Sequence, residues 1–277
     1  MNEKINLWNR IVRRSIFLLM ILLNIAGLLI PGWHVNGLIL ICATVLIVLL
    51  HGLERYGWRP ILFLFFSAWI ISNFFEWYSI HYGFPFGYYY YTGGYKIFDV
   101  PFIIMLAYFT CCYASYGVSK ILLRQFGNKQ RGLQTFSIPL VASFVMVAWD
   151  VVMDPMNSTV QKQWIWADGG SYFGVPLSNY AGWFLVVFLI SMSFSIVLKY
   201  YDSGKTSLNE DTGFWLEPLI IYGLICLNTM ISSLTNTDNQ FKYLFDSMLL
   251  INIFTMVFII ILSLLILFDP NRKVLKS

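Results

Sequence analysis

The sequence predicts an all-α integral membrane protein, a polytopic bundle of about eight transmembrane helices with both termini in the cytoplasm. Hydrophobic residues make up 58% of the 277-residue chain and charged residues 12%, against roughly 45–50% and about 25% in soluble domains. The apolar residues form long runs rather than stripes, which indicates segments surrounded by lipid. Because unpaired backbone groups are costly in hydrocarbon and no barrel-like alternation is present, we expect these runs to be helices.

The individual spans follow from the length of each apolar run. A helix needs about 20 largely apolar residues to cross a bilayer. Eight segments approach this length: residues 15–30, 35–53, 60–78, 100–122, 135–153, 180–200, 214–234 and 248–268. The turn at residues 31–36 is short, so the first two spans are expected to form an antiparallel hairpin. No internal repeat or long linker is present, so residues 1–277 are expected to form a single integral membrane domain.

Basic residues predict the orientation of the bundle. With eight spans, fifteen lysines and arginines fall on the side of the N-terminus, and only Lys96, Lys162 and Lys242 fall on the other side. This asymmetry predicts that both termini are cytoplasmic and that the protein is a multi-pass protein of the cell membrane. The net charge of +4 is explained by these cytoplasmic residues, so it does not indicate nucleic-acid binding.

No pattern in the chain indicates a metal or another cofactor. The three histidines, His34, His51 and His81, are scattered and do not have the spacing of a zinc or haem site. All four cysteines lie within predicted spans, which indicates apolar packing rather than disulfides. We therefore expect neither a metal nor a cofactor.

Two segments rich in aromatic residues follow the third and the fifth predicted spans. Residues 74–92 read FFEWYSIHYGFPFGYYYYT, and residues 149–183 contain a second glycine- and proline-broken stretch with several Trp and Tyr. Trp and Tyr also gather at membrane interfaces without any specific function. The predicted topology nevertheless puts both loops on the same, non-cytoplasmic side, where they are able to share one pocket.

Acidic residues inside or beside apolar spans are costly in lipid, which makes them candidates for function. Five are present, in chain order Glu76, Asp99, Asp150, Asp154 and Glu217. Glu217 is expected in the first turn of the seventh span, where a negative charge suits the helix dipole, so we interpret it as structural. The candidates for chemistry are Glu76, near the outer end of its span, and the pair Asp150 and Asp154.

The aspartate pair has the spacing of neighbours on a helix. Asp150 and Asp154 are four residues apart and share one helix face, and Pro155 then limits how far that helix continues regularly. Because like charges repel and apolar surroundings disfavour ionisation, at least one of the pair is expected to keep its proton at neutral pH. A protonated carboxylic acid beside apolar space is a proton donor. The alternative for these acids, Glu76 included, is that they cap helices or bind backbone amides.

At these residues the chain resembles the carotenoid hydratase family of the CruF type, which includes archaeal bisanhydrobacterioruberin hydratases. The first signature of the family is matched by Glu76, Gly83, Pro85, Phe86, Gly87, Tyr89, Tyr91, Val100 and Pro101. The second is matched by Asp154, Pro155, Trp164, Trp166, Tyr172, Phe173, Gly174, Pro176, Asn179, Gly182 and Trp183. The chain departs from the pattern at Tyr108, where tryptophan is expected, and at the extra tyrosines Tyr88 and Tyr90. We expect these departures not to involve the acids.

The resemblance implies that the substrate is an acyclic carotenoid dissolved in the lipid bilayer, and that water is added across its terminal double bond. Protonation of that bond leaves a tertiary carbocation, which aromatic faces stabilise by up to about 2 kcal/mol or more each when desolvated. We expect Asp154 to be the acid, Asp150 to keep it protonated, and Glu76 to orient or deprotonate water, with the roles of Glu76 and Asp154 interchangeable.

The resemblance also implies the residues that surround the substrate. Those expected to bind it are Phe86, Tyr89, Tyr91, Trp164, Trp166, Tyr172 and Trp183, with Asn179 positioning water. An association with other enzymes of carotenoid synthesis is left open.

Two other functions fit the same residues. A carotenoid cyclase of the lycopene type uses the same protonation, but an internal double bond traps the cation instead of water. A transporter or lipid-binding membrane protein only holds an amphiphile in its aromatic loops. The mass of the product separates the two enzymes, and the absence of a product indicates the binding protein.

Overall fold

The computed structural model describes residues 3–30, 36–127, 132–201 and 211–270, and over these residues the chain is an all-α membrane bundle. Its α-helices are α1 (Glu3–Leu29), α2 (Gly37–Tyr56), α3 (Trp58–Tyr82), α4 (Phe102–Leu122), α5 (Gln134–Asp154), α6 (Leu177–Tyr200), α7 (Thr212–Thr235), α8 (Lys242–Asn252) and α9 (Phe258–Leu267). The predicted turn at residues 31–36 lies outside the described residues except for Asn36. Six of the eleven basic residues expected at the cytoplasmic loops and the C-terminus also lie outside them, namely Lys129, Arg131, Lys205, Arg272, Lys273 and Lys276.

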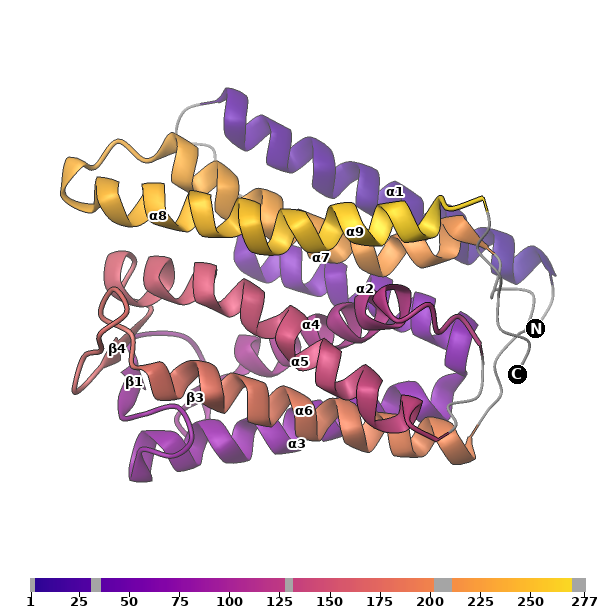
Figure 1. The fold of residues 1–277 in the computed structure, drawn as a ribbon, viewed down its shortest axis with the longest axis horizontal. Helices are drawn as coiled ribbons and strands as arrows, with labels where there is room; N and C mark the ends of the chain where they lie inside the picture. The colour runs from indigo at the N-terminus through magenta and orange to yellow at the C-terminus, as the bar shows by residue number, and fades with distance from the viewer. Residues whose placement is uncertain (1–2, 31–35, 128–131, 202–210, 271–277) are drawn as a thin grey trace.

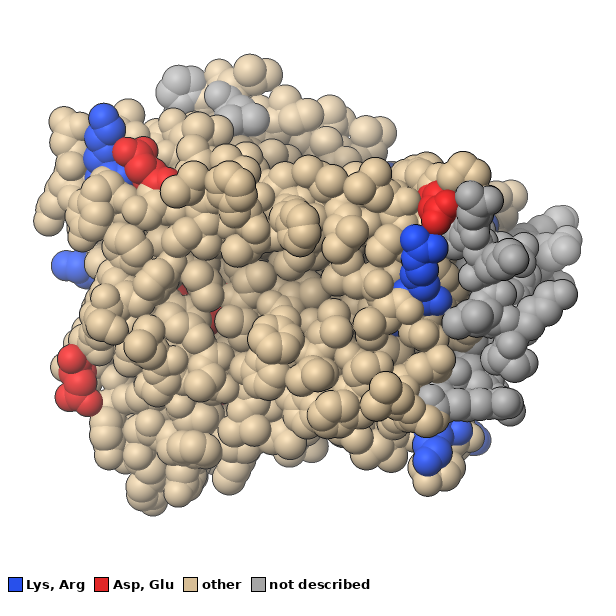
Figure 2. Space-filling model, in the orientation of Figure 1, with Lys and Arg blue, Asp and Glu red and all other residues tan. Residues whose placement is uncertain are grey.

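Seven helices among the described residues are long and apolar enough to cross a membrane. They are α2 to α7 and the continuous rod formed by α8, a π-helical segment η4 (Ile253–Val257) and α9. Helix α1 is the eighth long helix of the bundle, but its first half carries charge. Figure 2 shows that the charged residues on one face gather toward the two ends of the molecule and leave a belt between them with almost no Lys, Arg, Asp or Glu on its surface.

The helices run lengthwise through the bundle, and the short strands lie at one end (Figure 1). Helix α1 begins and α9 ends at the opposite end from the strands, as the predicted topology requires. That this end faces the cytoplasm remains a prediction.

Two helix boundaries differ from the predicted spans for physical reasons. Helix α1 begins at Glu3 rather than near residue 15, because Arg10 and Arg13 in the added turns pair with acidic residues of α2 and α7 and need not lie at the membrane surface. Regular α-structure in α5 ends at Asp154, as expected from Pro155, but the rod continues as the π-helix η1 (Pro155–Val160). The extra segment carries the chain toward the second aromatic loop.

Two pairs of short strands, which the sequence analysis did not predict, organise the aromatic loops. Strand β1 (Tyr89–Tyr91) pairs antiparallel with β4 (Trp164–Trp166), and β2 (Lys96–Ile97) pairs with β3 (Val100–Pro101). Before β1, helix α3 ends at Gly83, whose φ of 75° belongs to the left-handed region and whose N–H bonds to Ser79 O at 2.8 Å. A glycine suits this position because a side chain there is strained.

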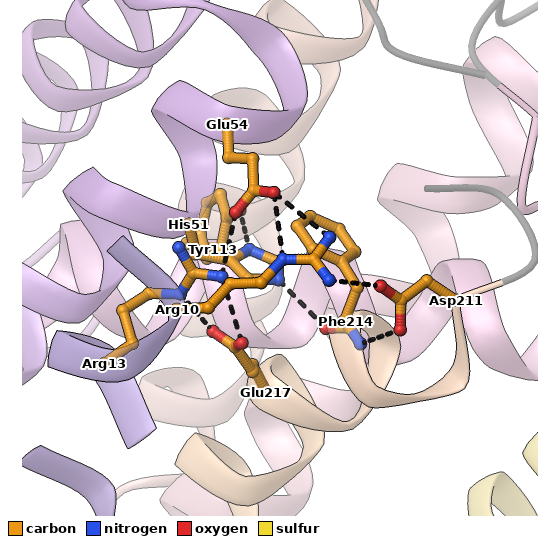
Figure 3. Close-up of polar contacts among 8 residues, drawn as sticks. All are labelled: Arg10, Arg13, His51, Glu54, Tyr113, Asp211, Phe214 and Glu217. Carbon is orange, nitrogen blue, oxygen red and sulfur yellow. Dashed lines mark hydrogen bonds and ion pairs between the residues drawn. The ribbon is translucent and has the colours of Figure 1, made fainter. Parts of the chain in front are cut away.

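A cluster of charged residues attaches the first half of α1 to the bundle (Figure 3). The guanidinium of Arg13, which is fully buried, binds Glu217 on α7 at 2.5 and 3.0 Å and Glu54 on α2 at 3.0 Å. Arg10 adds contacts to Glu54 and to Asp211. The expectation that Glu217 lies in the first turn of its helix is wrong, because α7 begins at Thr212 and its first turn holds no acidic residue. The carboxylate of Glu217 is instead the ion-pair partner of Arg13.

Candidate active site

The two aromatic segments meet in the β1–β4 pair. Tyr89 faces Trp166 and Tyr91 faces Trp164 across the pair. Because side chains alternate along a strand, these four rings point into the protein and are buried, whereas Tyr90 points outward and is 54% exposed. The two aromatic loops therefore lie side by side at these four residues.

Glu76 is surrounded by phenol groups. Tyr89 and Tyr91 donate their hydroxyls to Glu76 Oε2, the latter at 2.9 Å, and Tyr108 donates to Oε1 at 2.8 Å. A carboxylate has about four acceptor positions, so these bonds occupy three and leave one on Oε1. The Glu76 side chain is therefore held rigidly and retains one position for a water molecule.

The aspartate pair is held by the second aromatic strand and by α6. Asp154 Oδ1 accepts hydrogen bonds from the indole N–H groups of Trp164 at 3.0 Å and Trp166 at 3.4 Å. The amide nitrogen of Asn179 donates to Oδ2 of both acids, to Asp154 at 2.6 Å and to Asp150 at 2.9 Å. One amide thus bridges the two carboxyl groups, while Asp150 Oδ1 is buried and has no hydrogen-bond partner among the described residues.

Glu76 and Asp154 line the same small cavity, with a volume of about 50 Å³. A buried water needs about 10–15 Å³ of such space, so the cavity has room for a few waters or for the end of a hydrocarbon chain. The other predicted residues in its wall are Phe86, Tyr89, Tyr91, Trp164, Trp166, Asn179 and Trp183. The remaining wall is formed by Ile104, Ala107, Trp149 and Met153.

Close packing of α6 against the first aromatic loop shapes this cavity. A Cβ atom at Gly182 would lie 2.5 Å from the ring of Phe86, so only glycine allows this approach. The next residue, Trp183, stacks on Tyr108 with ring centroids 4.4 Å apart. The glycine and tryptophan of the second aromatic segment therefore support the pocket formed by the first.

Two predicted residues do not face the cavity. Tyr172 packs edge-on against Tyr180 with ring centroids 5.5 Å apart, and its hydroxyl donates to Val151 O at 3.3 Å. Burial raises the pKa of Tyr172 to about 12. Asp150 does not line the cavity and contacts it through Asn179. Both residues lie behind the site and support it.

The tyrosines of β1 are donors at neutral pH. Burial raises the pKa of Tyr89 and Tyr91 well above the usual value, and the neighbouring Glu76 raises it further. Both phenols therefore keep their protons and hold the carboxylate by hydrogen bonds. Among the described residues, no group of three or more His, Cys, Asp or Glu side chains has the arrangement of a metal site.

The sequence analysis missed the role of Tyr108. The expectation that the departure at Tyr108 does not involve the acids is wrong, because its hydroxyl contacts Glu76 directly. The residue is fully buried on α4, and a phenol in an apolar helix needs a hydrogen-bond partner. That requirement is visible in the sequence, but the identity of the partner is not.

Comparisons with known proteins show which family the chain resembles. The family model described as carotenoid biosynthesis protein matches residues 35–241. A curated relative, bisanhydrobacterioruberin hydratase from Haloarcula japonica, is 28% identical over 149 residues, which cover 52% of this chain and 47% of the relative. The aligned part thus spans about half the length of that relative. No solved structure matches the chain.

Proposed function

Because this chain belongs to the carotenoid biosynthesis protein family, we propose that it is a hydratase that adds water to the terminal carbon–carbon double bond of an acyclic carotenoid. The observation that carries the proposal is that Glu76 and Asp154 face one small cavity with walls of aromatic rings. The name of the relative from Haloarcula japonica supports the same reaction. The substrate dissolves in lipid, which suits a multi-pass protein that we assign to the cell membrane.

The first step is protonation of the alkene. The carboxylic acid of Asp154 gives its proton to the terminal double bond, the π-electrons form the new C–H bond, and a tertiary carbocation remains beside the carboxylate. The indole N–H groups of Trp164 and Trp166 hold Asp154 Oδ1 in place and stabilise the carboxylate as it forms. Asp150, bridged to Asp154 through Asn179, is a positioning residue that favours the protonated form of its neighbour.

The second step is capture of the cation by water. The faces of the surrounding rings stabilise the positive charge by up to about 2 kcal/mol or more each when desolvated. Glu76 uses its remaining acceptor position to orient a water molecule, whose oxygen forms the C–O bond and whose proton passes to the Glu76 carboxylate. This proton then returns through water in the shared cavity to Asp154, which restores the starting protonation state. The product is a tertiary alcohol, one water heavier than the substrate, and no cofactor takes part. The roles of Glu76 and Asp154 are interchangeable in this scheme.

Expression in a bacterium that accumulates an acyclic carotene, with pigment extracts analysed by mass spectrometry, tests the proposal. A new pigment heavier by one water supports hydration. A pigment of equal mass with a shortened chromophore would instead identify a cyclase. If the protein is present in the membrane and the pigment is unchanged, the chain only binds such a molecule or acts on a different polyene.

A further inference from the structure

A second, larger cavity lies beside the acid cavity and has no role in the chemistry described above. Its volume is about 440 Å³, and its walls come from α1, α2, α4, α5, α7 and the segment between α5 and α6. It extends along α2 from Gly37 to Ile47 and along α7 from Ile221 to Ser232, which corresponds to about 15 Å at 1.5 Å per residue. The cavity is therefore an elongated slot that runs parallel to the helices.

The slot and the acid cavity share a wall. Ile104 and Ala107 of α4, Trp149 and Met153 of α5, and Trp164 of β4 line both cavities. Ala107 is the smallest of these residues. Met153 has a flexible, unbranched side chain. A chain-like ligand needs only small side-chain movements at this wall to occupy both cavities at once.

The lining of the slot favours a hydrocarbon. At its inner end it is lined by Phe17, Ile47, Ile221 and Leu224. The hydroxyl of Thr110, another lining residue, bonds to carbonyls of its own helix, so it offers no free polar group. Amide and hydroxyl side chains gather instead at the other end, where Asn24, Gln161, Gln163, Asn228, Thr229 and Ser232 lie.

Helix α1 closes one side of the slot, and the buried charge cluster holds it there. Phe17, Met20 and Asn24 line the slot and lie on the same face of α1 as Arg13, with spacings of three and four residues. Arg13 is bound to Glu54 and Glu217 (Figure 3). The cluster therefore fixes the helix that forms this wall.

From this geometry we propose that the slot binds the part of the polyene chain next to the reacting end, while the terminal double bond lies in the acid cavity. The assignment rests on the proposed function, because the carotenoid supplies both the reacting end and the rigid apolar chain. Ala107 and Met153, at the shared wall, then determine which end groups reach the acids. A membrane lipid is the competing occupant, because an acyl chain has similar apolar character.

The test measures binding rather than product. The full-length protein carrying Asp154→Asn is purified in mild detergent from a bacterium that accumulates lycopene, and bound pigment is measured by visible absorbance per protein. Adding Ala107→Trp fills the shared wall, and adding Ile225→Trp fills the slot alone, since Ile225 lines only the larger cavity. Ala181→Trp is the matched control, because Ala181 is exposed on α6 and lines neither cavity.

Each filled variant is expected to bind at least about tenfold less lycopene than the control, equivalent to about 1.4 kcal/mol of binding free energy. Size-exclusion chromatography identifies any variant that has failed to fold, and the two positions lie on different helices, α4 and α7. Equal pigment in the filled variants and the control would overturn the assignment. So would a parent protein that retains phospholipid but no lycopene.

The results distinguish a failure of the binding-site proposal from a failure of the proposed function. If the unsubstituted protein forms no hydrated pigment, yet filling the slot still abolishes lycopene binding, the reaction is wrong and the binding site stands. If hydrated pigment forms and the filled variants still bind lycopene as the control does, the reaction stands and the binding site is wrong.

Discussion

Replacing Asp154 by asparagine separates the chemistry of this carboxyl group from its structural role. In the native protein, Oδ1 accepts from two indole N–H groups and Oδ2 accepts from the amide of Asn179. The asparagine oxygen is able to take the place of Oδ1 and keep both indole bonds. Its NH₂ group then faces the NH₂ group of Asn179, so one of three hydrogen bonds is lost.

The structural cost of this change is moderate. A buried donor left without an acceptor costs about 1–3 kcal/mol, whereas native proteins have about 5–15 kcal/mol of stability. Rotation of the Asn179 amide recovers the bond to residue 154. It also turns the amide oxygen toward Asp150, so the hydrogen bond from Asn179 to Asp150 is lost instead. The variant is therefore expected to fold and to unfold at a lower temperature than the native protein.

The expected loss of activity is much larger than the loss of stability. An amide cannot donate a proton to an alkene, and a positioned general acid contributes about 10²–10⁴-fold to rate. The assay follows conversion of an acyclic carotene by membranes containing equal amounts of protein, and thermal unfolding in detergent is measured in parallel. Asp168→Asn is the matched control, because Asp168 is exposed in the loop after β4.

These two variants are expected to behave in opposite ways. Asp168→Asn should keep native activity and stability, while Asp154→Asn should be folded and nearly inactive. If Asp154→Asn converts carotene as fast as the control does, Asp154 is not the acid and the assignment of roles is wrong. A normal rate for Asp154→Asn combined with inactive Glu76→Gln would transfer the acid role to Glu76.

Three further outcomes follow from the structure. Arg13→Met leaves a buried carboxylate without its cation and is expected to lower the free energy of unfolding by about 3–5 kcal/mol. Arg10→Met, at a side chain that is 30% exposed, should lower it by about 0–1 kcal/mol. Thermal unfolding compares the two variants, and equal shifts in unfolding temperature would contradict a structural role for the buried Arg13. Tyr108→Phe removes one of the three phenol hydroxyls that donate to Glu76, a loss of about 1 kcal/mol that should slow the hydration rate roughly fivefold. Tyr90→Phe should leave the rate unchanged. Burial raises the pKa of Tyr89, so the unfolded chain loses this proton at a lower pH than the folded protein does, and stability should decline as pH rises above about 10. Thermal unfolding measures this decline, which should be weaker in Tyr89→Phe. An identical decline in the variant would count against a buried, protonated Tyr89.

Much of this architecture depends on properties that act locally along the chain. Apolar runs of about 20 residues cannot be soluble and cannot leave their backbone unpaired in lipid, so the sequence alone determined an all-α membrane bundle. The acids also stood out, since Glu76 and Asp154 are costly within apolar segments unless they are used or paired. The end of the regular helix at Pro155 was also predictable from the sequence, because proline restricts the backbone of the residue before it.

The partners of these residues were decided only by tertiary structure. Two- and three-residue strands such as β1 and β4 have no detectable periodicity, and they form because the bundle brings residues about 75 positions apart into register. The hydroxyl of Tyr108 reaches Glu76 for the same reason, and Arg13 reaches Glu217 across 204 positions. A composition or a motif indicates that a buried polar group needs a partner, but the partner is chosen by how the helices pack, because hydrogen bonds act only over about 3 Å.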